Sequence, residues 1–595
     1  MTIAPMKRVT LAGMAGDKAP ALEGLQALGC LHLTPLRPPQ PLEAPDAAER
    51  RRATAAFRWL KDAPSPRRPW PPDRETDLDR LIADALTNKE RVGALSDRRD
   101  FLAKRVADLE PWGEFRFPLP EAVAHRKLWF YILPLKERRA LDAVDTPWAV
   151  VARDPTRLFV ALIAEEEPPA DILPVPRTHT GAVPLSALQR ELEDLEIEIE
   201  EAQAIRGALG RWRLVLGAHL AAAEDGDDRR AAAQMTRDEG AVFALQGWAP
   251  AEAAPALERF AADRGLALVL ADPAPGEDPP TLLETPERLG AGADLTRFYM
   301  TPAYRSWDPS LLVFAAFAVF FAMILSDAGY AALIGLGTAL YWRRMGRGAT
   351  GARLRVLLAA LAGVSFLYGV CAGSYFGVAP PEGSPLAAIA FIDVNDFETM
   401  MRVSIVIGAL HLALAQGVSA WLNRGTGRAT AALGWIAAIA GGLTLWLAAG
   451  LATAAYAALG AGLLAVFWGA GADRRVTGAM DALRRLGDGA LGLTGVTKLF
   501  GDVLSYMRLF ALGLSSASLA ATFNGLSGQV LESVPGAGVL LAGLVLLFGH
   551  AVNLALGIMS GVVHGLRLNF IEFFGWGLTE EGYPFRAFAR REIEA

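Results

Sequence analysis

Hydrophobic residues follow two different patterns along this chain. Through about the first 300 residues they recur at helix or strand spacing among dense charges, whereas beyond Arg305 the charges nearly vanish through runs such as 311–342 and 429–468. Each of these runs exceeds the roughly 20 apolar residues that a helix needs to cross a bilayer. The pattern therefore predicts two domains, a cytoplasmic one over residues 1–300 and a transmembrane one over residues 301–595.

Two stretches of the first domain carry apolar residues at heptad spacing. One covers residues 78–109, and the other steps by three and four through residues 185–199. Such spacing is typical of coiled coils, so we expect a two-stranded antiparallel coiled coil. Two solvated amphipathic helices of an ordinary globular domain are the alternative.

Short strand-like runs surround these two helices. They alternate with helical stretches, which predicts small α/β lobes at one or both ends of the coiled coil and an α+β fold for the first domain. The runs are 7–11, 129–133, 148–152, 158–163 and 267–270, and the helical stretches are 19–28 and 251–264. The sequence shows no glycine-rich phosphate loop, metal-ligand cluster or nucleophile constellation here. We therefore expect a strut, without a catalytic residue, cofactor or metal.

Charge in the short loops predicts how the second domain crosses the bilayer, because positive residues mark the cytoplasmic side. The run 311–340 leads into arginines at 343–355, on the side where the first domain is also expected, so the run must cross twice. We therefore expect a break at residues 326–329; a single tilted helix is the alternative. The remaining runs alternate, which gives an all-α domain with about eight crossings and its C-terminus in the cytoplasm.

The last two apolar helices are predicted to be unusually long. They cover about residues 491–526 and 539–574. At 1.5 Å per residue, either could reach about 50 Å, well above the roughly 30 Å of hydrocarbon in a bilayer. We expect both helices to tilt strongly or to run partly outside the bilayer.

Composition narrows the class of protein further. Hydrophobic residues make up 52% of the 595 residues and charged residues only 21%, which is too apolar for an ordinary soluble protein. The net charge of −6 argues against a nucleic-acid partner. The two cysteines, Cys30 and Cys371, lie in different domains, so we expect no disulfide framework. The lipid bilayer is the expected surrounding of the second domain.

Polar residues at helical spacing follow both long helices. The penultimate helix carries Lys498, Asp502, Ser505, Arg508, Ser515 and Ser516, and the last carries His550, Asn553, Gly557, Ser560, His564 and Arg567. Steps of three and four residues place side chains on one side of a helix. Each long helix is therefore expected to present a polar stripe on an otherwise apolar rod.

Arg508 has the clearest chemical consequence. Insertion scales assign about 2.5–3.5 kcal/mol to an arginine at the centre of a membrane helix, and its guanidinium stays ionised. A fixed cation there can attract a carboxylate from a partner, favour its ionised form and so expel the proton or sodium ion that it carries. The alternative is a packing arginine paired with Asp502 or with a carbonyl.

The other polar residues are candidates for the lining of aqueous half-channels. This set comprises Ser505, Ser515, Ser516, His550, Asn553, Ser560, His564 and Glu572. Arg567 is a second candidate for ion translocation, and an ion pair with nearby Glu572 is its structural alternative. For the two histidines, hydrogen bonds between helices are an equally good explanation.

Two motifs in the long helices resemble a known family. Residues 504–514 (LSYMRLFALGL) and 563–574 (VHGLRLNFIEFF) are similar to the two arginine motifs of the membrane stator subunit of V-type and archaeal A-type rotary ATPases, called subunit a or subunit I. Residues 583–585 resemble the family's closing stretch, and weaker matches extend over nearly the whole chain. The modest length and short outer loops suit a prokaryotic member in a plasma membrane.

The resemblance implies how such a chain works. Ions enter one half-channel, bind a carboxylate on a rotor ring of small membrane subunits, ride the ring, and leave through the other half-channel after meeting Arg508. The coiled-coil half would bind peripheral-stalk subunits, which resist torque from the ATPase head, and contact with the head and central stalk would be indirect. ATP chemistry belongs to other subunits, so the chain is not expected to be an enzyme by itself.

One position departs from the family pattern. Many relatives carry an acidic residue ten positions before the second arginine, where this chain has Gly557. The half-channel on that side is therefore expected to use other groups. A secondary ion transporter with a midplane Arg508 site is the alternative function, although the internal repeat of helices that is usual in such folds is not seen. A membrane-anchored scaffold is a third possibility, and it leaves Arg508 unexplained.

Overall fold

The computed structural model describes all residues except 1, 39–46, 65, 115–125, 182, 287–289, 393–395, 473, 475, 579 and 592–595. Contacts divide the chain into two compact units. The helical unit comprises Met1–Ala15, Cys30–Thr34 and Asp238–Ala587, and the arm unit comprises Gly16–Gly29, Pro35–Arg237 and Phe588–Ala595. The first 300 residues thus contribute to both units. The predicted boundary at residue 300 separates a cytoplasmic from a transmembrane domain, and it stays a prediction.

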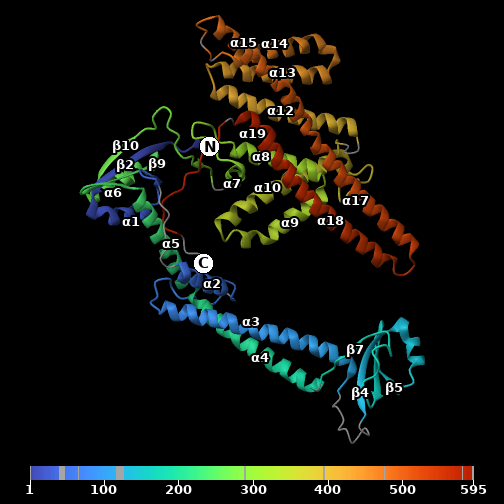
Figure 1. The fold of residues 1–595 in the computed structure, drawn as a ribbon. Coiled ribbons are helices and arrows are strands. Elements are labelled where there is room, and N and C mark those ends of the chain that lie inside the picture. Colours follow the sequence, from blue (N-terminus) through green and yellow to red (C-terminus); the bar gives the residue numbers. More distant parts are fainter. Residues whose placement is uncertain are drawn as a thin grey trace. The chain divides into compact units, whose positions relative to one another are not determined.

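Two long antiparallel helices dominate the arm unit (Figure 1). Its helices are α1 Lys18–Leu28, α2 Ala47–Lys61, α3 Leu78–Leu109, α4 Leu185–Leu209 and α5 Arg213–Met235. Arg98 of α3 pairs with Glu191 of α4 at 2.6 Å, and Asn88 Nδ2 donates to Ala202 O at 2.9 Å. Because later residues of α3 meet earlier residues of α4, the two helices run antiparallel. The helices predicted from the heptads at residues 78–109 and 185–199 are therefore confirmed as α3 and α4. Their packing as a coiled coil stays a prediction.

Asn88 interrupts the apolar seam of α3 for a reason that the structure supplies. It is buried, its Oδ1 accepts from Trp59 Nε1 at 3.1 Å, and its Nδ2 bonds the carbonyl of Ala202. Both ends of the amide are therefore used, which satisfies a polar group in an apolar interface. One side chain thus links α2, α3 and α4.

An antiparallel sheet packs at one end of α3 and α4. Its order is β5–β6–β4–β7, with bounds Trp148–Arg153, Arg157–Ala164, Lys127–Pro134 and Arg177–Thr178. Leu109 and Leu188 of the helices share a buried cluster with Phe130 and Phe159 of the sheet. The three strands predicted in this region are confirmed, and so is the lobe that they form.

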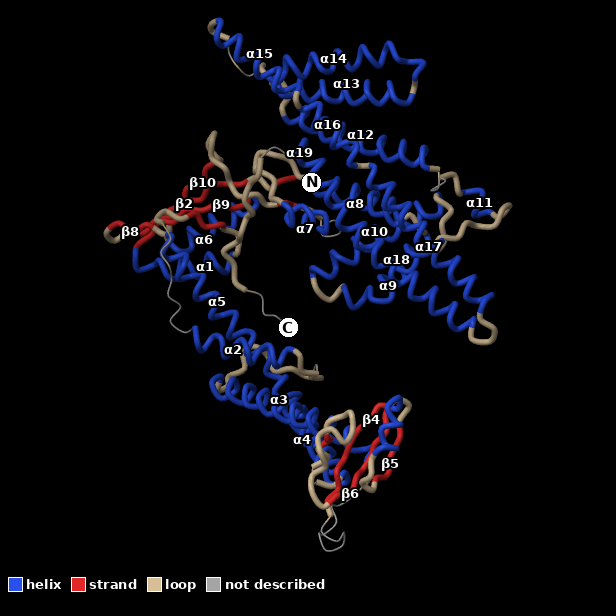
Figure 2. The backbone as a smooth tube through the Cα atoms, turned by 45° about the vertical axis from the view of Figure 1, so that its right-hand side comes forward, coloured by secondary structure: helices blue, strands red, loops and turns tan. Residues whose placement is uncertain are grey.

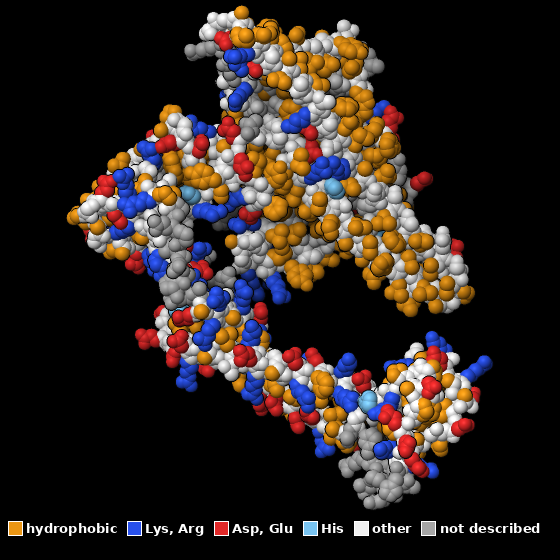
Figure 3. All heavy atoms as spheres, in the orientation of Figure 1, with side chains coloured by type: hydrophobic (Ala, Val, Ile, Leu, Met, Phe, Trp, Pro, Cys, Tyr) orange, Lys and Arg blue, Asp and Glu red, His pale blue; other side chains and the backbone are white. Residues whose placement is uncertain are grey.

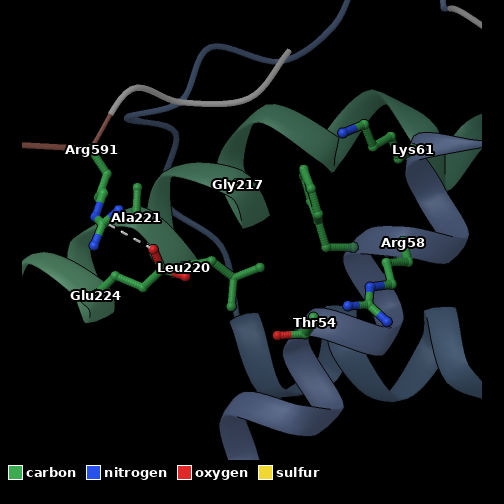
Figure 4. Close-up of a pocket in the computed structure, with 9 residues that line it drawn as sticks. Thr54, Arg58, Lys61, Gly217, Leu220, Ala221, Glu224 and Arg591 are labelled. Atoms are coloured by element: carbon green, nitrogen blue, oxygen red, sulfur yellow. Dashed lines mark ion pairs between the residues drawn. The ribbon is translucent and has the colours of Figure 1, made fainter. Parts of the chain in front are cut away.

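A cavity of about 560 Å³ lies between α2 and α5 of the arm unit (Figure 4). Arg58 and Lys61 line it from α2. Glu224 of α5 lies on its other side, where it pairs with Arg591 at 3.7 Å. The Arg591 backbone nitrogen also donates to Asp225 Oδ1 at 2.9 Å. These contacts hold the segment around Arg591 onto α5.

The helical unit contains a mixed α/β part and a large set of helices (Figure 2). Its main sheet is antiparallel, in the order β10–β2–β9–β3, with bounds Ala267–Ala271, Met6–Met14, Val242–Pro250 and His32–Thr34. Strand β8 Arg237–Glu239 also pairs with β9. A separate two-stranded sheet joins β1 Thr2–Ile3 to β11 Leu283–Glu284. The helices of this part are α6 Ala254–Arg264 and α7 Gly290–Tyr299. The strands predicted at 7–11 and 267–270 are therefore confirmed.

Within the described residues, six helical stretches are long and apolar enough to cross a membrane. They are α10 Ala349–Cys371, α12 Phe397–Leu422, α13 Gly427–Leu447, α14 Ala452–Ala470, Ala479–Ser533 and Gly538–Gly577. A shorter apolar helix, α8 Ser310–Leu325, precedes them, followed by α9 Ala328–Met345. The C-terminal half is therefore helical, as expected; the count of eight crossings stays a prediction.

The predicted break at residues 326–329 is confirmed. Helix α8 ends at Leu325. The next residue, Ser326, has a φ of 48°, which is uncommon for a residue other than glycine, and α9 starts after Asp327. Asp327 Oδ1 accepts from the Tyr330 backbone nitrogen at 2.9 Å, so it caps the new helix. Its Oδ2 accepts from Ser374 Oγ at 2.7 Å and from the backbone nitrogen of Gly377 at 2.9 Å. Asp327 thus stabilises the break both within α9, through Tyr330, and through contacts with the segment at residues 374–377.

The penultimate helix is not continuous, contrary to expectation. It consists of α15 Ala479–Leu493, α16 Gly495–Ser505 and α17 Met507–Ser533, with interruptions at Thr494 and Tyr506. Tyr506 is completely buried, and its hydroxyl lies 2.8 Å from His411 Nδ1 on α12. A Cβ at Gly408 would lie only 2.5 Å from the Tyr506 ring, so this glycine permits the close fit. The interruption at Tyr506 thus coincides with close packing of the Tyr506 ring against α12.

The last helix is continuous as predicted and then widens. Helix α18 covers Gly538–Arg567, a π-helical turn η9 covers Leu568–Phe573, and α19 covers Phe574–Gly577. Large apolar side chains on α18, such as Leu540, Leu547 and Phe548, are about two-thirds exposed. Figure 3 shows hydrophobic side chains spread over the visible face around α17 and α18. An apolar surface of this extent fits contact with lipid.

Candidate functional site

Arg508 lies in the first turn of α17, directly after the interruption at Tyr506. Its side chain is 24% exposed, and its Nη2 donates to Ser505 Oγ at 3.1 Å. The other terminal nitrogen, Nη1, is buried and has no hydrogen-bond partner among the described residues. One arm of the guanidinium is therefore anchored, and the other keeps its hydrogen-bonding capacity.

A buried carboxylate lies between two arginines. Glu572 belongs to the π-helical turn η9, and only 3% of its side chain is exposed. Its Oε1 accepts from Ser505 Oγ at 2.5 Å and lies 4.0 Å from both Arg508 Nη1 and Arg567 Nε. Ser505, Arg508, Arg567 and Glu572 thus form what we call the arginine cluster.

The ion pairs in the arginine cluster are loose. Close arginine–carboxylate pairs have N–O distances of about 2.7–2.9 Å, whereas both distances to Glu572 are 4.0 Å. Glu572 Oε2 has no hydrogen-bond partner among the described residues, and the Arg567 side chain is 48% exposed. The carboxylate therefore offsets the charge of the arginines without occupying their donors.

Asp502 is engaged elsewhere. Its Oδ2 accepts from Trp576 Nε1 at 2.7 Å, and Lys498, one turn earlier, donates to the carbonyl of Gly575 at 2.9 Å. Both residues therefore fasten α16 to α19. The partner expected for Arg508 in a purely structural role thus bonds a different residue.

A second polar cluster joins α9, α17 and α18. Tyr330 Oη lies 2.7 Å from His550 Nδ1 and 3.0 Å from Asn553 Nδ2, while His550 Nε2 lies 3.0 Å from Asn524 Oδ1. Asn553 Nδ2 also donates to Ser516 O at 2.9 Å. We call these five residues the His550 network. His550 precedes Arg567 by 17 residues, so along α18 the two clusters lie about 25 Å apart.

Some of the residues predicted to line a half-channel lie outside both clusters. Ser515 is exposed and bonds the carbonyl of Ala511 within its own helix. His564 Nδ1 is buried without a hydrogen-bond partner among the described residues, and no described contact brings Ser560 into either cluster. Gly557 is buried; a Cβ there would lie 3.1 Å from Leu325 Cδ1 and 3.9 Å from Ser516 Oγ. That position therefore faces the His550 network.

Sequence reasoning missed Tyr330 and Asn524 as site residues. Tyr330 follows the predicted helix break by three residues, and Asn524 lies eight residues after Ser516 on α17. A polar residue in an apolar helix was the available signal for Asn524. The described residues contain no group of three or more His, Cys, Asp or Glu side chains that could hold a metal ion.

The chain is similar to several known proteins. No family model matches the chain. It is 25% identical to the V-type ATP synthase subunit I of Chlamydia pneumoniae over 86% of both chains. It is 26% identical to V-type ATP synthase subunit I 1 of Treponema pallidum over 99% of this chain and 100% of that protein. With the A-type ATP synthase subunit I of Methanocaldococcus jannaschii it shares 28% identity over 69% of this chain and 65% of that protein.

Solved structures are similar to this chain as well. One of them is the cytoplasmic N-terminal domain of a subunit I that is a homologue of subunit a of V-ATPase, with 17% identity and a TM-score of 0.23, covering 44% of this chain and 99% of that one. The sequence similarity over nearly the full length identifies the chain as a homologue of the subunit I proteins of V-type and A-type ATP synthases.

Proposed function

We propose that this chain is the ion-conducting stator subunit of a V/A-type rotary ATPase or ATP synthase. In this role it couples transmembrane ion transport to ATP hydrolysis or synthesis in other subunits, and it has no catalytic residue of its own. Arg508 would meet the ion-binding carboxylates of a rotor ring one after another. The arginine cluster carries the proposal, because Arg508 Nη1 keeps a free donor beside a loosely held acid.

The physical argument rests on exchange of carboxylates. A guanidinium bound tightly to an internal acid would have no donor left for an arriving one. With Glu572 at 4.0 Å, Arg508 keeps its charge partly balanced and can still form close charge-assisted bonds with a ring carboxylate. Formation of those bonds favours the ionised carboxylate and expels its cation. The secondary-transporter alternative has no observation in its favour.

We further propose the placement of the chain. The helices from α8 onward would lie in a prokaryotic plasma membrane, with α8 and α9 as a hairpin that completes eight crossings, and the long helices strongly tilted. Residues 1–300 and the C-terminus would lie in the cytoplasm. The α3–α4 pair would act as a coiled-coil arm that binds peripheral-stalk subunits, while contact with the central stalk and the ATPase head would be indirect.

Substitution of Arg508 tests the function directly. In the intact complex, Arg508→Ala should abolish ATP-driven ion pumping into membrane vesicles while the rotor ring still co-purifies. Arg424→Ala is the matched control, because Arg424 is an exposed arginine at the end of α12, stacked on Trp421. Pumping at the control rate in Arg508→Ala would refute the proposal.

A further inference from the structure

One buried imidazole on α12 contacts the neighbours of both charged partners in the arginine cluster. His411 is 7% exposed, and its Nδ1 lies 2.8 Å from Tyr506 Oη. Its ring also stacks on Phe573, with the ring centroids 4.4 Å apart and an angle of 14° between the planes. Tyr506 precedes Arg508 by two residues, and Phe573 directly follows Glu572. A single side chain therefore joins the segment that carries the arginine to the segment that carries the acid.

The rings around this junction are closely packed. Phe320 of α8 meets the rings of His411 and Tyr506 edge to face, with centroids 5.1 Å and 5.7 Å away. Phe320, Tyr506 and Phe573 are each at most 2% exposed. Side chains in such close-packed interiors have little room to move. His411 is thus held firmly, and it can in turn hold Tyr506 and Phe573 at a fixed separation.

The hydrogen bond to Tyr506 distinguishes this imidazole from a ring that only fills space. His411 Nε2 is buried and has no hydrogen-bond partner among the described residues. A buried polar atom without a partner destabilises a fold, and a phenylalanine ring would fill a similar volume without that cost. Within the described part of the chain, the contact between Nδ1 and Tyr506 Oη is the hydrogen bond that the imidazole gains in return.

The gap between Arg508 and Glu572 needs support of this kind. Their nearest charged atoms lie 4.0 Å apart, whereas close arginine–carboxylate pairs have N–O distances of about 2.7–2.9 Å. Opposite charges attract more strongly away from water, so the segments that carry the two residues must resist closure. A relative shift of about 1 Å would close the pair and occupy Arg508 Nη1, which otherwise has no hydrogen-bond partner among the described residues.

We propose that His411 is a positioning residue of the arginine cluster. By bonding Tyr506 and stacking on Phe573, it keeps the start of α17 and the π-helical turn η9 at the separation that leaves Arg508 Nη1 available to an arriving carboxylate. His411 itself touches neither that carboxylate nor the transported ion. This inference rests on the proposed stator function and deepens it, because it makes transport depend on a third helix, α12, remote in sequence from both arginine motifs.

Two substitutions remove the same hydrogen bond from opposite ends. His411→Phe keeps an aromatic ring against Phe573 and lacks the nitrogen, whereas Tyr506→Phe lacks only the hydroxyl. ATP-driven ion pumping is measured in vesicles that contain the intact complex, and it is normalised to the amount of assembled complex. Each variant should lower pumping by about threefold to tenfold, as loss of one hydrogen bond does. Because the bond is shared, the double variant should pump no more slowly than either single variant.

Ser404→Ala is the matched control for these variants. Ser404 is buried on the same helix as His411, and its Oγ has no hydrogen-bond partner among the described residues. Its replacement therefore changes a buried polar group of α12 without breaking a described hydrogen bond. Pumping by Ser404→Ala should stay near the rate of the unmodified complex.

A second background separates positioning from packing. Glu572→Gln removes the charge that attracts Arg508. If His411 acts by keeping Arg508 and Glu572 apart, His411→Phe should have no further effect on pumping in complexes that already carry Glu572→Gln. A defect of packing alone would instead lower pumping by the same factor with Glu572 and with Gln at that position.

Two results would overturn the positioning role. One is pumping at the Ser404→Ala rate by both single variants, and the other is an equal loss from His411→Phe in the two Glu572 backgrounds. If the His411→Phe complex does not assemble, Tyr506→Phe decides in both backgrounds. Arg508→Ala is run beside them: when only that variant loses pumping, the positioning role fails and the stator function stands, and when it keeps pumping, the stator function fails.

Discussion

The two polar clusters of the membrane helices differ in how completely their groups are bonded. In the arginine cluster the charged atoms lie 4.0 Å apart, and both Arg508 Nη1 and Glu572 Oε2 have no hydrogen-bond partner among the described residues. In the His550 network each ring nitrogen of His550 has one hydrogen-bond partner. One cluster is charged and loosely held, and in the other both nitrogens of the central ring are engaged.

This difference in hydrogen bonding indicates a different role for each cluster. Buried charges without close partners are costly, so a loose cluster is useful where a partner arrives and leaves. A network whose donors and acceptors are satisfied is rigid, which suits a fixed junction between α9, α17 and α18. About 25 Å of α18 separates the two clusters.

Among the variants that probe the difference between the two clusters, the largest effect is expected from removal of the acid that balances the arginines. Breaking a buried ion pair costs about 3–5 kcal/mol, and the exposure of Arg567 reduces that cost here. Because about 1.4 kcal/mol corresponds to a factor of ten, Glu572→Leu should lower ATP-driven pumping by more than about tenfold. Glu580→Leu, at an exposed position, is the control. Unchanged pumping by an intact Glu572→Leu complex would show that the acid of the arginine cluster has no function in transport.

An intermediate effect, on thermal stability, is expected from overpacking the break between α8 and α9, next to Tyr330 of the His550 network. A Cβ at Gly369 of α10 would lie 2.2 Å from Ala328 N, whereas a Cβ at Gly363 on the same helix would meet nothing within 4 Å. Overpacking of this kind costs about 1–3 kcal/mol. Gly369→Ala should therefore lower the thermal stability of the purified complex and Gly363→Ala should not. Equal melting temperatures for the two variants would contradict the tight fit of the break.

The smallest effect is expected for the hydroxyl that bridges the arginine cluster. Ser505 donates to Glu572 and accepts from Arg508, whereas Ser515 bonds only a carbonyl of its own helix. Loss of a hydrogen bond costs about 0.5–1.5 kcal/mol, so Ser505→Ala should slow pumping by about threefold to tenfold. Ser515→Ala should remain near the unmodified rate. A larger effect from Ser515→Ala would reverse the assignment of the two serines.

Hydrophobic periodicity located most elements because it reports which face of a helix or strand is buried. The heptads of residues 78–109 coincide with α3, and the strands at 129–133 and 158–163 lie within β4 and β6. The break at residues 326–329 was predictable from charge. The arginines after the apolar run and the first domain before it are both expected on the cytoplasmic side, which requires an even number of crossings. The candidate residues Arg508 and Glu572 were visible as polar groups in apolar helices.

The sequence by itself determined where the helices, the break and the charged residues occur, because those features depend on residues a few positions apart. Only the tertiary structure decided that Tyr506 interrupts the penultimate helix, where a buried ring bonds His411 across 95 residues. Only it placed Tyr330 against His550, 220 residues later. Such pairs depend on how helices pack, and packing joins side chains whose separation along the chain carries no periodic signal.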